Sequence, residues 1–180
     1  EKAAAYMADG YARAGRRPGV CMSQSVGAAN IASGLQDPYL GGSPVIAITG
    51  RAIPTAQHRN AYQEIIHTPL FEPVTKFNVV LESPAQLPYL LRQAIREAMS
   101  GTPGPVHLDL GGIRGEMIEL AEGDWSAIIE EPFTHLPPFR PEPEPGLVEE
   151  AAQILKNAER PGSPWRLPLT GKEPSLKITP

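Results

Sequence analysis

The stretch from Pro44 to Gly50 reads Pro-Val-Ile-Ala-Ile-Thr-Gly and has the strongest strand signal in the chain. It is a short, continuous apolar run with a turn-forming residue at each side. Such runs are typical of strands that are buried on both faces of a parallel sheet. Residues 19–23, 76–81 and 105–110 have a similar character, although the run at 76–81 is less apolar. The sequence therefore predicts strands at these four places.

Helical patterns alternate with these strands. Residues 1–14 are rich in alanine, and Gly15 and Pro18 follow them as stop signals. A helix of small residues is expected at 25–35, and residues 84–99 and 146–158 have apolar side chains at helical spacing. Because strands and helices alternate over residues 1–118, we expect an α/β domain with a mainly parallel sheet. Such sheets bind ligands at the carboxyl ends of their strands.

The composition favours a protein that works on small molecules. The chain has 180 residues, of which 41% are hydrophobic and 20% charged, and this suits one domain with a sizeable core. A net charge of −4 and a pI of about 5.6 exclude a basic surface for nucleic acid or anionic membranes. The sequence has neither an apolar run of about 20 residues nor a signal-peptide pattern, so we expect a cytoplasmic protein.

Four stretches occur in order along the chain. They are Glu1-Lys-Ala-Ala-Ala-Tyr-Met-Ala-Asp-Gly-Tyr-Ala-Arg13, Gln24-Ser-Val-Gly-Ala-Ala-Asn30, Ala61-Tyr-Gln-Glu64 and Gly101-Thr-Pro-Gly-Pro-Val-His-Leu-Asp-Leu110. Together they resemble the N-terminal, pyrimidine-binding domain of thiamine diphosphate-dependent enzymes of the acetolactate synthase and decarboxylase kind. The resemblance covers about residues 1–158. It implies a three-layer α/β fold, with helices flanking the sheet, in a lyase or transferase that acts on 2-oxo acids.

The resemblance implies a catalytic role for Glu1. In the family, a glutamate at the start of this helix hydrogen-bonds a ring nitrogen of the cofactor's aminopyrimidine. This contact favours the imino tautomer, whose nitrogen removes the proton from the thiazolium carbon. The role needs a carboxyl group that is shielded from water. The alternative is a solvated glutamate that assists the helix N-terminus through the helix dipole.

The segment from Gln24 to Asn30 resembles the family's Ser-Gly-Pro-Gly-x-x-Asn turn, which approaches the pyrimidine ring. The cofactor-binding residues implied are Gln24, Val26, Gly27 and Asn30. Gly27 retains the ability to bring the backbone close to a ligand. Gln24, Ser25 and Val26 replace the family's serine, first glycine and proline. The alternative is an ordinary strand-to-helix turn, with Asn30 in the first helical turn.

The segment Ala61-Tyr62-Gln63-Glu64 resembles the family's Ala-Phe-Gln-Glu, whose aromatic residue and glutamine face the reaction centre. Gln63 is therefore a second catalytic candidate, and Tyr62 and Gln63 are candidate substrate contacts. The alternatives are an exposed helix position for Gln63 and a Tyr62 hydroxyl that points to water. The pair at 75–76, Thr-Lys, also matches the family and is expected to have a structural role.

Polar residues outside these segments are weaker candidates for a functional site. His107 and Asp109 alternate on one strand, which indicates a polar strand edge rather than a metal pair. His58 and His67 flank the Tyr-Gln-Glu segment with no third ligand at a recognisable spacing, so we expect no protein metal site. The single cysteine, Cys21, lies in an apolar run and is expected to be a buried, inert thiol. No nucleophile elbow or phosphate-binding loop is found.

The cofactor implied is thiamine diphosphate with Mg²⁺. In the family, a C-terminal domain with a Gly-Asp-Gly and Asn signature holds the diphosphate and the metal, and this signature is not present here. Each family active site lies between two subunits, so the parent is expected to be a homodimer or tetramer. The resemblance thus implies at most half a cofactor site, and we expect this chain to be inactive alone. A separately encoded binding or regulatory subunit and a nucleotide-binding α/β module unrelated to thiamine are the alternatives.

The prolines suggest how the chain is divided, because 11 of the 21 lie in residues 132–180. We expect the pyrimidine-binding domain at 1–131, without the first strand and helix that precede the glutamate in the family. Residues 132–146 are expected to be an extended linker, and residues 147–161 resemble the start of the family's middle domain. Residues 162–180 depart from the family and are expected to be a disordered or aberrant tail.

Overall fold

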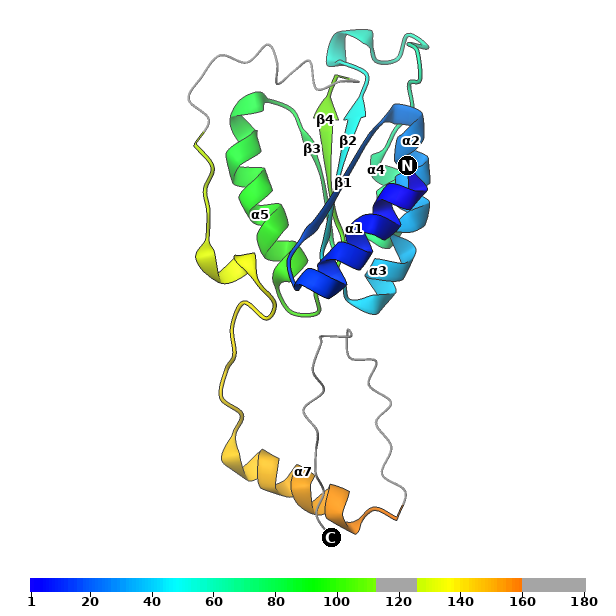
Figure 1. Ribbon diagram of the computed structural model, residues 1–180. Helices are drawn as coiled ribbons and strands as arrows, with labels where there is room; N and C mark the ends of the chain where they lie inside the picture. The colour runs from blue at the N-terminus through cyan, green and yellow to red at the C-terminus, as the bar shows by residue number, and fades with distance from the viewer. Residues whose placement is uncertain (113–125, 160–180) are drawn as a thin grey trace.

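The computed structural model describes residues 1–112 and 126–159, in which four parallel strands are flanked by helices on both faces (Figure 1). The strands are β1 (Gly19–Gln24), β2 (Val45–Arg51), β3 (Phe77–Leu81) and β4 (Val106–Gly111), in the spatial order β1-β2-β4-β3. The predicted three-layer α/β fold is confirmed. The strands lie where the apolar runs predict them, to within two residues at each end.

The helices cover the two faces separately. Those labelled in Figure 1 are α1 (Lys2–Gly15), α2 (Ser25–Gly34), α3 (Gln36–Gly41), α4 (Thr68–Phe71), α5 (Leu87–Met99) and α7 (Pro145–Asn157). Helix α5 covers one face, and α1 to α4 lie on the other (Figure 1). The start of the helix predicted at 84–99 is different, since Pro84–Gln86 forms a 3-10 turn. Ser83 and Gln86 form a capping box there.

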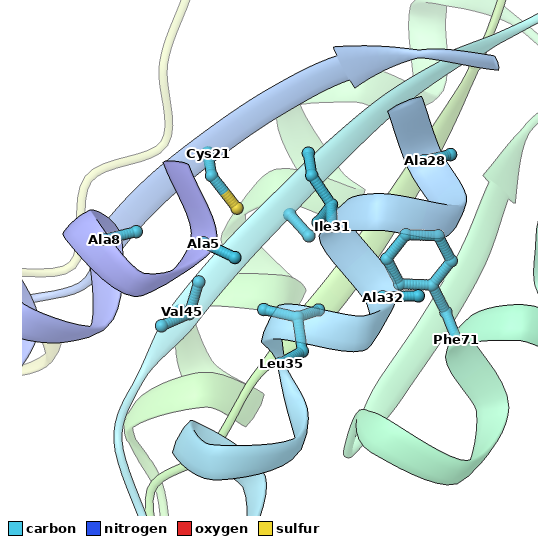
Figure 2. Packing of buried hydrophobic residues seen from close by; sticks show 10 residues of the cluster. Ala5, Ala8, Cys21, Ala28, Ile31, Ala32, Leu35, Val45 and Phe71 are labelled. Carbon is cyan, nitrogen blue, oxygen red and sulfur yellow. The ribbon is translucent and has the colours of Figure 1, made fainter. Parts of the chain in front are cut away.

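The core beneath α1 and α2 is built from small residues. Figure 2 shows Ala5 and Ala8 of α1 against Cys21 of β1, with Ile31 of α2 and Leu35, which directly follows α2, beside them. The alanines allow α1 to lie close to the sheet, because larger side chains would hold the two backbones apart. Burial raises the pKa of the Cys21 thiol to about 11. The prediction of a buried, inert thiol is confirmed, since the reactive thiolate is then scarce at neutral pH.

The pair Thr75 and Lys76 holds the start of β3 in place. The Thr75 hydroxyl donates to the carbonyl of Phe71 at 2.7 Å. Lys76 Nζ donates to the carbonyls of Glu97 and Ser100, at 2.6 and 2.7 Å, where α5 ends. Carbonyls at a helix C-terminus have no partner within the helix, so the ammonium group caps α5. These contacts confirm the structural role expected for this pair.

Residues 126–159 extend beyond the sheet. Glu131–Thr134 forms a 3-10 turn, and Phe133 of this turn is buried beside α5, where the Arg96 guanidinium lies 5.4 Å from its ring. Arg96 also pairs with Glu130. Helix α7 has no buried residue. The tail predicted after residue 161 lies outside the described residues. No helix in the described part of the chain is both long and apolar enough to cross a bilayer.

Candidate cofactor and substrate site

The site begins where β1 passes directly into α2. Strand β1 ends at Gln24 and the helix starts at Ser25, so no loop separates them. Gln24 has an extended backbone and is exposed, whereas Ser25 is fully buried. The first turn of α2 therefore spans residues 25–28. The placement of Asn30 in the first helical turn was wrong, because the helix starts early enough to put Asn30 in the second turn.

Glu1, Gly27 and Asn30 lie together beside this junction. A Cβ atom built on Gly27 would lie 2.7 Å from Glu1 Cγ, 3.0 Å from Glu1 Cδ and 2.0 Å from Ser23 Oγ. Asn30 Nδ2 donates to Glu1 Oε2 at 3.2 Å. Glycine is needed at position 27 because the glutamate and the helix backbone approach each other more closely than any side chain would allow.

The Glu1 carboxylate is exposed at the N-terminus of α1. It makes no side-chain capping hydrogen bond to α1 and contacts residues of α2 instead. The side chains of Glu1 and Asn30 are both open to solvent in the described chain. Shielding of the carboxylate from water would therefore have to come from a bound molecule or from another protein surface.

The loop after β2 forms a cavity of about 760 Å³ next to this junction. Val26 and Gln63 both contribute to its lining, one from α2 and the other from the loop. The Ser25 hydroxyl donates to the backbone carbonyl of Gln63 and ties the loop to the first turn of α2. The residues predicted for the cofactor turn and for the substrate segment are thus adjacent in space.

Gln63 occupies a turn rather than a helix, and its φ of 59° lies in the left-handed region. The alternative of an exposed helix position for Gln63 is therefore wrong. Its amide Nε2 donates to the Tyr62 hydroxyl at 3.2 Å, while its Oε1 is buried and has no hydrogen-bond partner among the described residues. Tyr62 itself is 77% exposed and does not line the cavity. Of the two, only Gln63 lines the cavity.

Glu64 fixes the shape of the loop. Its carboxylate accepts hydrogen bonds from the backbone N–H groups of His58 and Ala61. The bond from His58 and then the bond from Ala61 lower the pKa of Glu64 below its usual range, since both favour the charged form. The carboxylate therefore acts as a local cross-link, and the residues that surround Gln63 depend on it.

A buried polar network lies behind the cavity, and sequence reasoning missed it. His107 and Asp109 do not lie at a strand edge, because β4 lies between β2 and β3 in the interior of the sheet. Thr49 of β2 is in register with Asp109. Its Oγ1 lies 2.8 Å from Asp109 Oδ1, 2.7 Å from His107 Nε2 and 3.1 Å from His67 Nδ1. The alternation of His107 and Asp109 was the available signal, but the strand order was needed to interpret it.

His107 is held as a neutral ring within this network. Burial lowers its pKa to about 3, and the Asp109 carboxylate opposes this shift only in part. The ring stacks on Phe71, with the centroids 3.6 Å apart and the planes 6° from parallel. In the described residues, no group of three His, Cys, Asp or Glu side chains is arranged to hold a metal ion.

Comparison with known proteins connects this site to a family. Residues 1–70 match the family model described as "Thiamine pyrophosphate enzyme, N-terminal TPP binding domain". The chain is 37% identical over 165 residues to a probable acetolactate synthase large subunit of Methanocaldococcus jannaschii, and the match covers 89% of the chain and 27% of that protein. It is also 37% identical over 165 residues to the acetolactate synthase isozyme 2 large subunit of Escherichia coli (strain K12), with 89% of the chain and 28% of that protein covered.

An acetolactate synthase of Arthrospira platensis is 35% identical over 166 residues, with 89% of the chain and 28% of that protein covered. The chain thus spans about a quarter of the length of the curated relatives that it matches.

Proposed function

We infer that this chain, which belongs to the thiamine pyrophosphate enzyme family as an N-terminal, pyrimidine-binding domain, supplies the pyrimidine half of a thiamine diphosphate site. The complete enzyme is proposed to be acetolactate synthase-like and to act on 2-oxo acids. One observation supports this proposal above the others: the Glu1 carboxylate, the Gly27 backbone and the Asn30 amide share one place beside the carboxyl end of β1.

These residues fit an aminopyrimidine ring. Glu1 offers a carboxylate that can share a proton with a ring nitrogen, and the Asn30 amide holds that carboxylate in one orientation. Gly27 has no side chain, which allows Glu1 to lie directly against the start of α2. When bound, thiamine diphosphate would supply the carbon nucleophile that attacks the substrate carbonyl. The exposure of Glu1 in this chain suits a group that becomes shielded only when cofactor and a partner surface cover it.

Gln63 is proposed to contact the substrate. Its Oε1 is buried in the cavity wall without a partner, so it can accept a hydrogen bond from a bound ligand. Val26 replaces the family's proline at the edge of the same cavity, and Gln24 extends from the end of β1. We propose that Val26 and Gln24 contact the cofactor and that Tyr62 reaches the substrate only when the complete enzyme assembles.

The remaining half of the site is proposed to come from other parts of the complete enzyme. The Mg²⁺ ion and the diphosphate would be held by a C-terminal domain, and the complete enzyme is proposed to be a homodimer or tetramer. The chain alone is then expected to bind the cofactor weakly and to turn over no substrate. A separately encoded subunit would differ in one respect, since mixing this chain with a diphosphate-binding chain would restore activity.

The test joins this chain to the remaining domains of the Methanocaldococcus jannaschii relative and measures pyruvate turnover together with calorimetric binding of thiamine diphosphate and Mg²⁺. We expect Glu1→Gln to lower turnover by about 10²–10⁴-fold, the usual contribution of a proton-transfer group. Glu142→Gln is the matched control, because Glu142 is exposed, belongs to no helix or strand and does not line the cavity. A Glu1→Gln enzyme with full turnover, or a fused protein that binds no cofactor, would contradict the proposal.

A further inference from the structure

We propose that His67, oriented by Asp109, is a proton-transfer residue of the cavity. In this role the neutral His67 ring takes a proton at Nε2 from water, and the imidazolium gives that proton to the carbonyl oxygen of a bound ligand. The C=O π bond breaks as a nucleophile forms a bond to the carbonyl carbon, so the oxygen becomes a hydroxyl group and the ring is neutral again. That the ligand is a small 2-oxo acid rests on the proposed function, whereas the proton-transfer role rests on the geometry of the His67 ring.

His67 lies at the junction of the loop and α4. It is 1% exposed, and the cavity lining includes it together with Asp109 and Arg51. Its Nδ1 lies 2.8 Å from Asp109 Oδ1. Because an ionised carboxylate can only accept, Nδ1 carries the hydrogen of this bond, and the lone pair of the neutral ring is then on Nε2.

Nε2 is the unusual atom of this ring. It is buried and has no hydrogen-bond partner among the described residues. Buried polar atoms in proteins are nearly always paired, so an unpaired ring nitrogen on a residue that lines a cavity indicates a site for a ligand atom. Two other lining residues, Gln63 and Arg51, also have a buried polar atom with no hydrogen-bond partner among the described residues, Oε1 and Nε respectively. The three atoms together suit a ligand with more than one polar group.

His107 shows what a purely structural histidine looks like in the same network. Asn78 Nδ2 donates to the Thr68 carbonyl at 2.7 Å, which turns Asn78 Oδ1 towards His107. His107 Nδ1 then donates to Asn78 Oδ1 at 2.8 Å, and its Nε2 lies 2.7 Å from Thr49 Oγ1. Both nitrogens of His107 are therefore engaged, and the ring has no group left to offer to a ligand.

The charges around His67 suit a proton acceptor. Asp109 stabilises the imidazolium that forms when Nε2 takes a proton, as the carboxylate of a catalytic triad does. Arg51 Nε lies 3.6 Å from Asp109 Oδ2, and Arg51 Nη2 lies 3.7 Å from Glu82 Oε1. The positive charge of Arg51 is therefore shared between the two carboxylates. The loop contributes His58 and Glu64 to the cavity lining, and β4 contributes the neutral His107 behind it. The Asp109 carboxylate orients the His67 imidazole and leaves its Nε2 without a partner, which is the arrangement of a general base.

The test is chemical modification of the 180-residue chain by diethyl pyrocarbonate, with the rate at each histidine followed by peptide mass spectrometry. We expect His67 to react about ten-fold faster than His107, since His107 must first break a hydrogen bond to expose a nitrogen. Pyruvate, the probe ligand, should slow the reaction at His67 and leave the exposed His135 unchanged. Equal rates at His67 and His107, or no protection by pyruvate, would overturn the proposal.

A second measurement does not depend on reactivity. Nitrogen-15 NMR of the histidine rings should show His67 with its hydrogen on Nδ1, and pyruvate should shift the Nε2 resonance. His67→Gln provides the control for resonance assignment, and a His67 ring with its hydrogen on Nε2 would overturn the proposal. Neither measurement contains thiamine diphosphate. A failure here therefore leaves the Glu1 assignment standing, and a failure of cofactor binding leaves the His67 result standing.

Discussion

The Glu1 side chain lies directly against the backbone of Gly27, so close that a methyl group on Gly27 would come within 2.7 Å of Glu1 Cγ. Gly27→Ala is therefore expected to destabilise the fold by about 1–3 kcal/mol through overpacking. It should also displace Glu1 and weaken cofactor binding in the complete enzyme. Urea denaturation measures the first effect and calorimetry the second.

Gly10→Ala is the matched control for this substitution. Nothing lies within 4 Å of a Cβ atom at Gly10, which is within α1. Alanine there should stabilise the protein by about 0.5–1 kcal/mol, because glycine is the poorer helix former. Equal effects of the two substitutions would show that neither Glu1 nor Ser23 lies tightly against Gly27 in solution.

Ser25→Ala should loosen the cavity loop. The Ser25 hydroxyl is the donor to the Gln63 carbonyl, and its loss is expected to cost about 0.5–1.5 kcal/mol. Hydrogen exchange at the amides of residues 57–66 should become faster, as measured by NMR. Ser33→Ala removes a local, exposed bond to the carbonyl of Asn30 in the same helix and should leave the loop unchanged. Equal exchange rates in wild type and Ser25→Ala would contradict this prediction.

His107 should make the protein less stable in acid. Its pKa in the folded chain is about 3 and the ordinary value is 6.5, so between these values the unfolded state binds more protons. Stability should therefore fall as the pH is lowered through this range, by up to about 1.4 kcal/mol per pH unit from this group. Urea midpoints measured from neutral to acid pH test the slope. His107→Gln should be less stable at neutral pH and show a shallower slope, and an unchanged slope would argue against the prediction.

Glu64 should make the loop around Gln63 less stable in acid, at pH values below 4.5. Since hydrogen bonds from His58 and Ala61 lower its pKa, the stability that it contributes is complete above the ordinary value of 4.5. This contribution is lost as the pH falls through the lowered pKa. Exchange at the His58 and Ala61 amides should increase in that range, and Glu64→Gln should show the fast exchange already at neutral pH. Glu72→Gln, at an exposed position without these bonds, should behave like wild type.

The strands could be predicted because their signal is local. The run at 45–48 is apolar on both faces, so its burial can be derived without knowing its neighbours. The short helix α3 was not predicted, since it has only six residues and contains Pro38, and the four-residue helix α4 has no periodicity to detect. Short elements of this kind form because packing around them is favourable rather than because of their own propensity.

The candidate site could be predicted only in part, because it depends on contacts between distant residues. Three short segments that resemble the family pointed to Glu1, Gly27 and Gln63. The structure places these segments around one strand-to-helix junction. His107 and Asp109 were assigned to a strand edge because the local sequence pattern does not show the order of the strands in the sheet. Their partner Thr49 lies about 60 residues earlier in the chain.

The serine at position 25 has a mechanical consequence. A glycine there, as in the family's turn, would leave the loop after β2 and the first turn of α2 to move separately. The Ser25 hydroxyl joins them, and α2 also bears Gly27 and Asn30 against Glu1. Movement of the loop around Gln63 must therefore either break one hydrogen bond or tilt the whole helix. A small molecule that enters the cavity and moves the Gln63 loop would then also move α2, and with it the contacts of Gly27 and Asn30 with the Glu1 carboxylate.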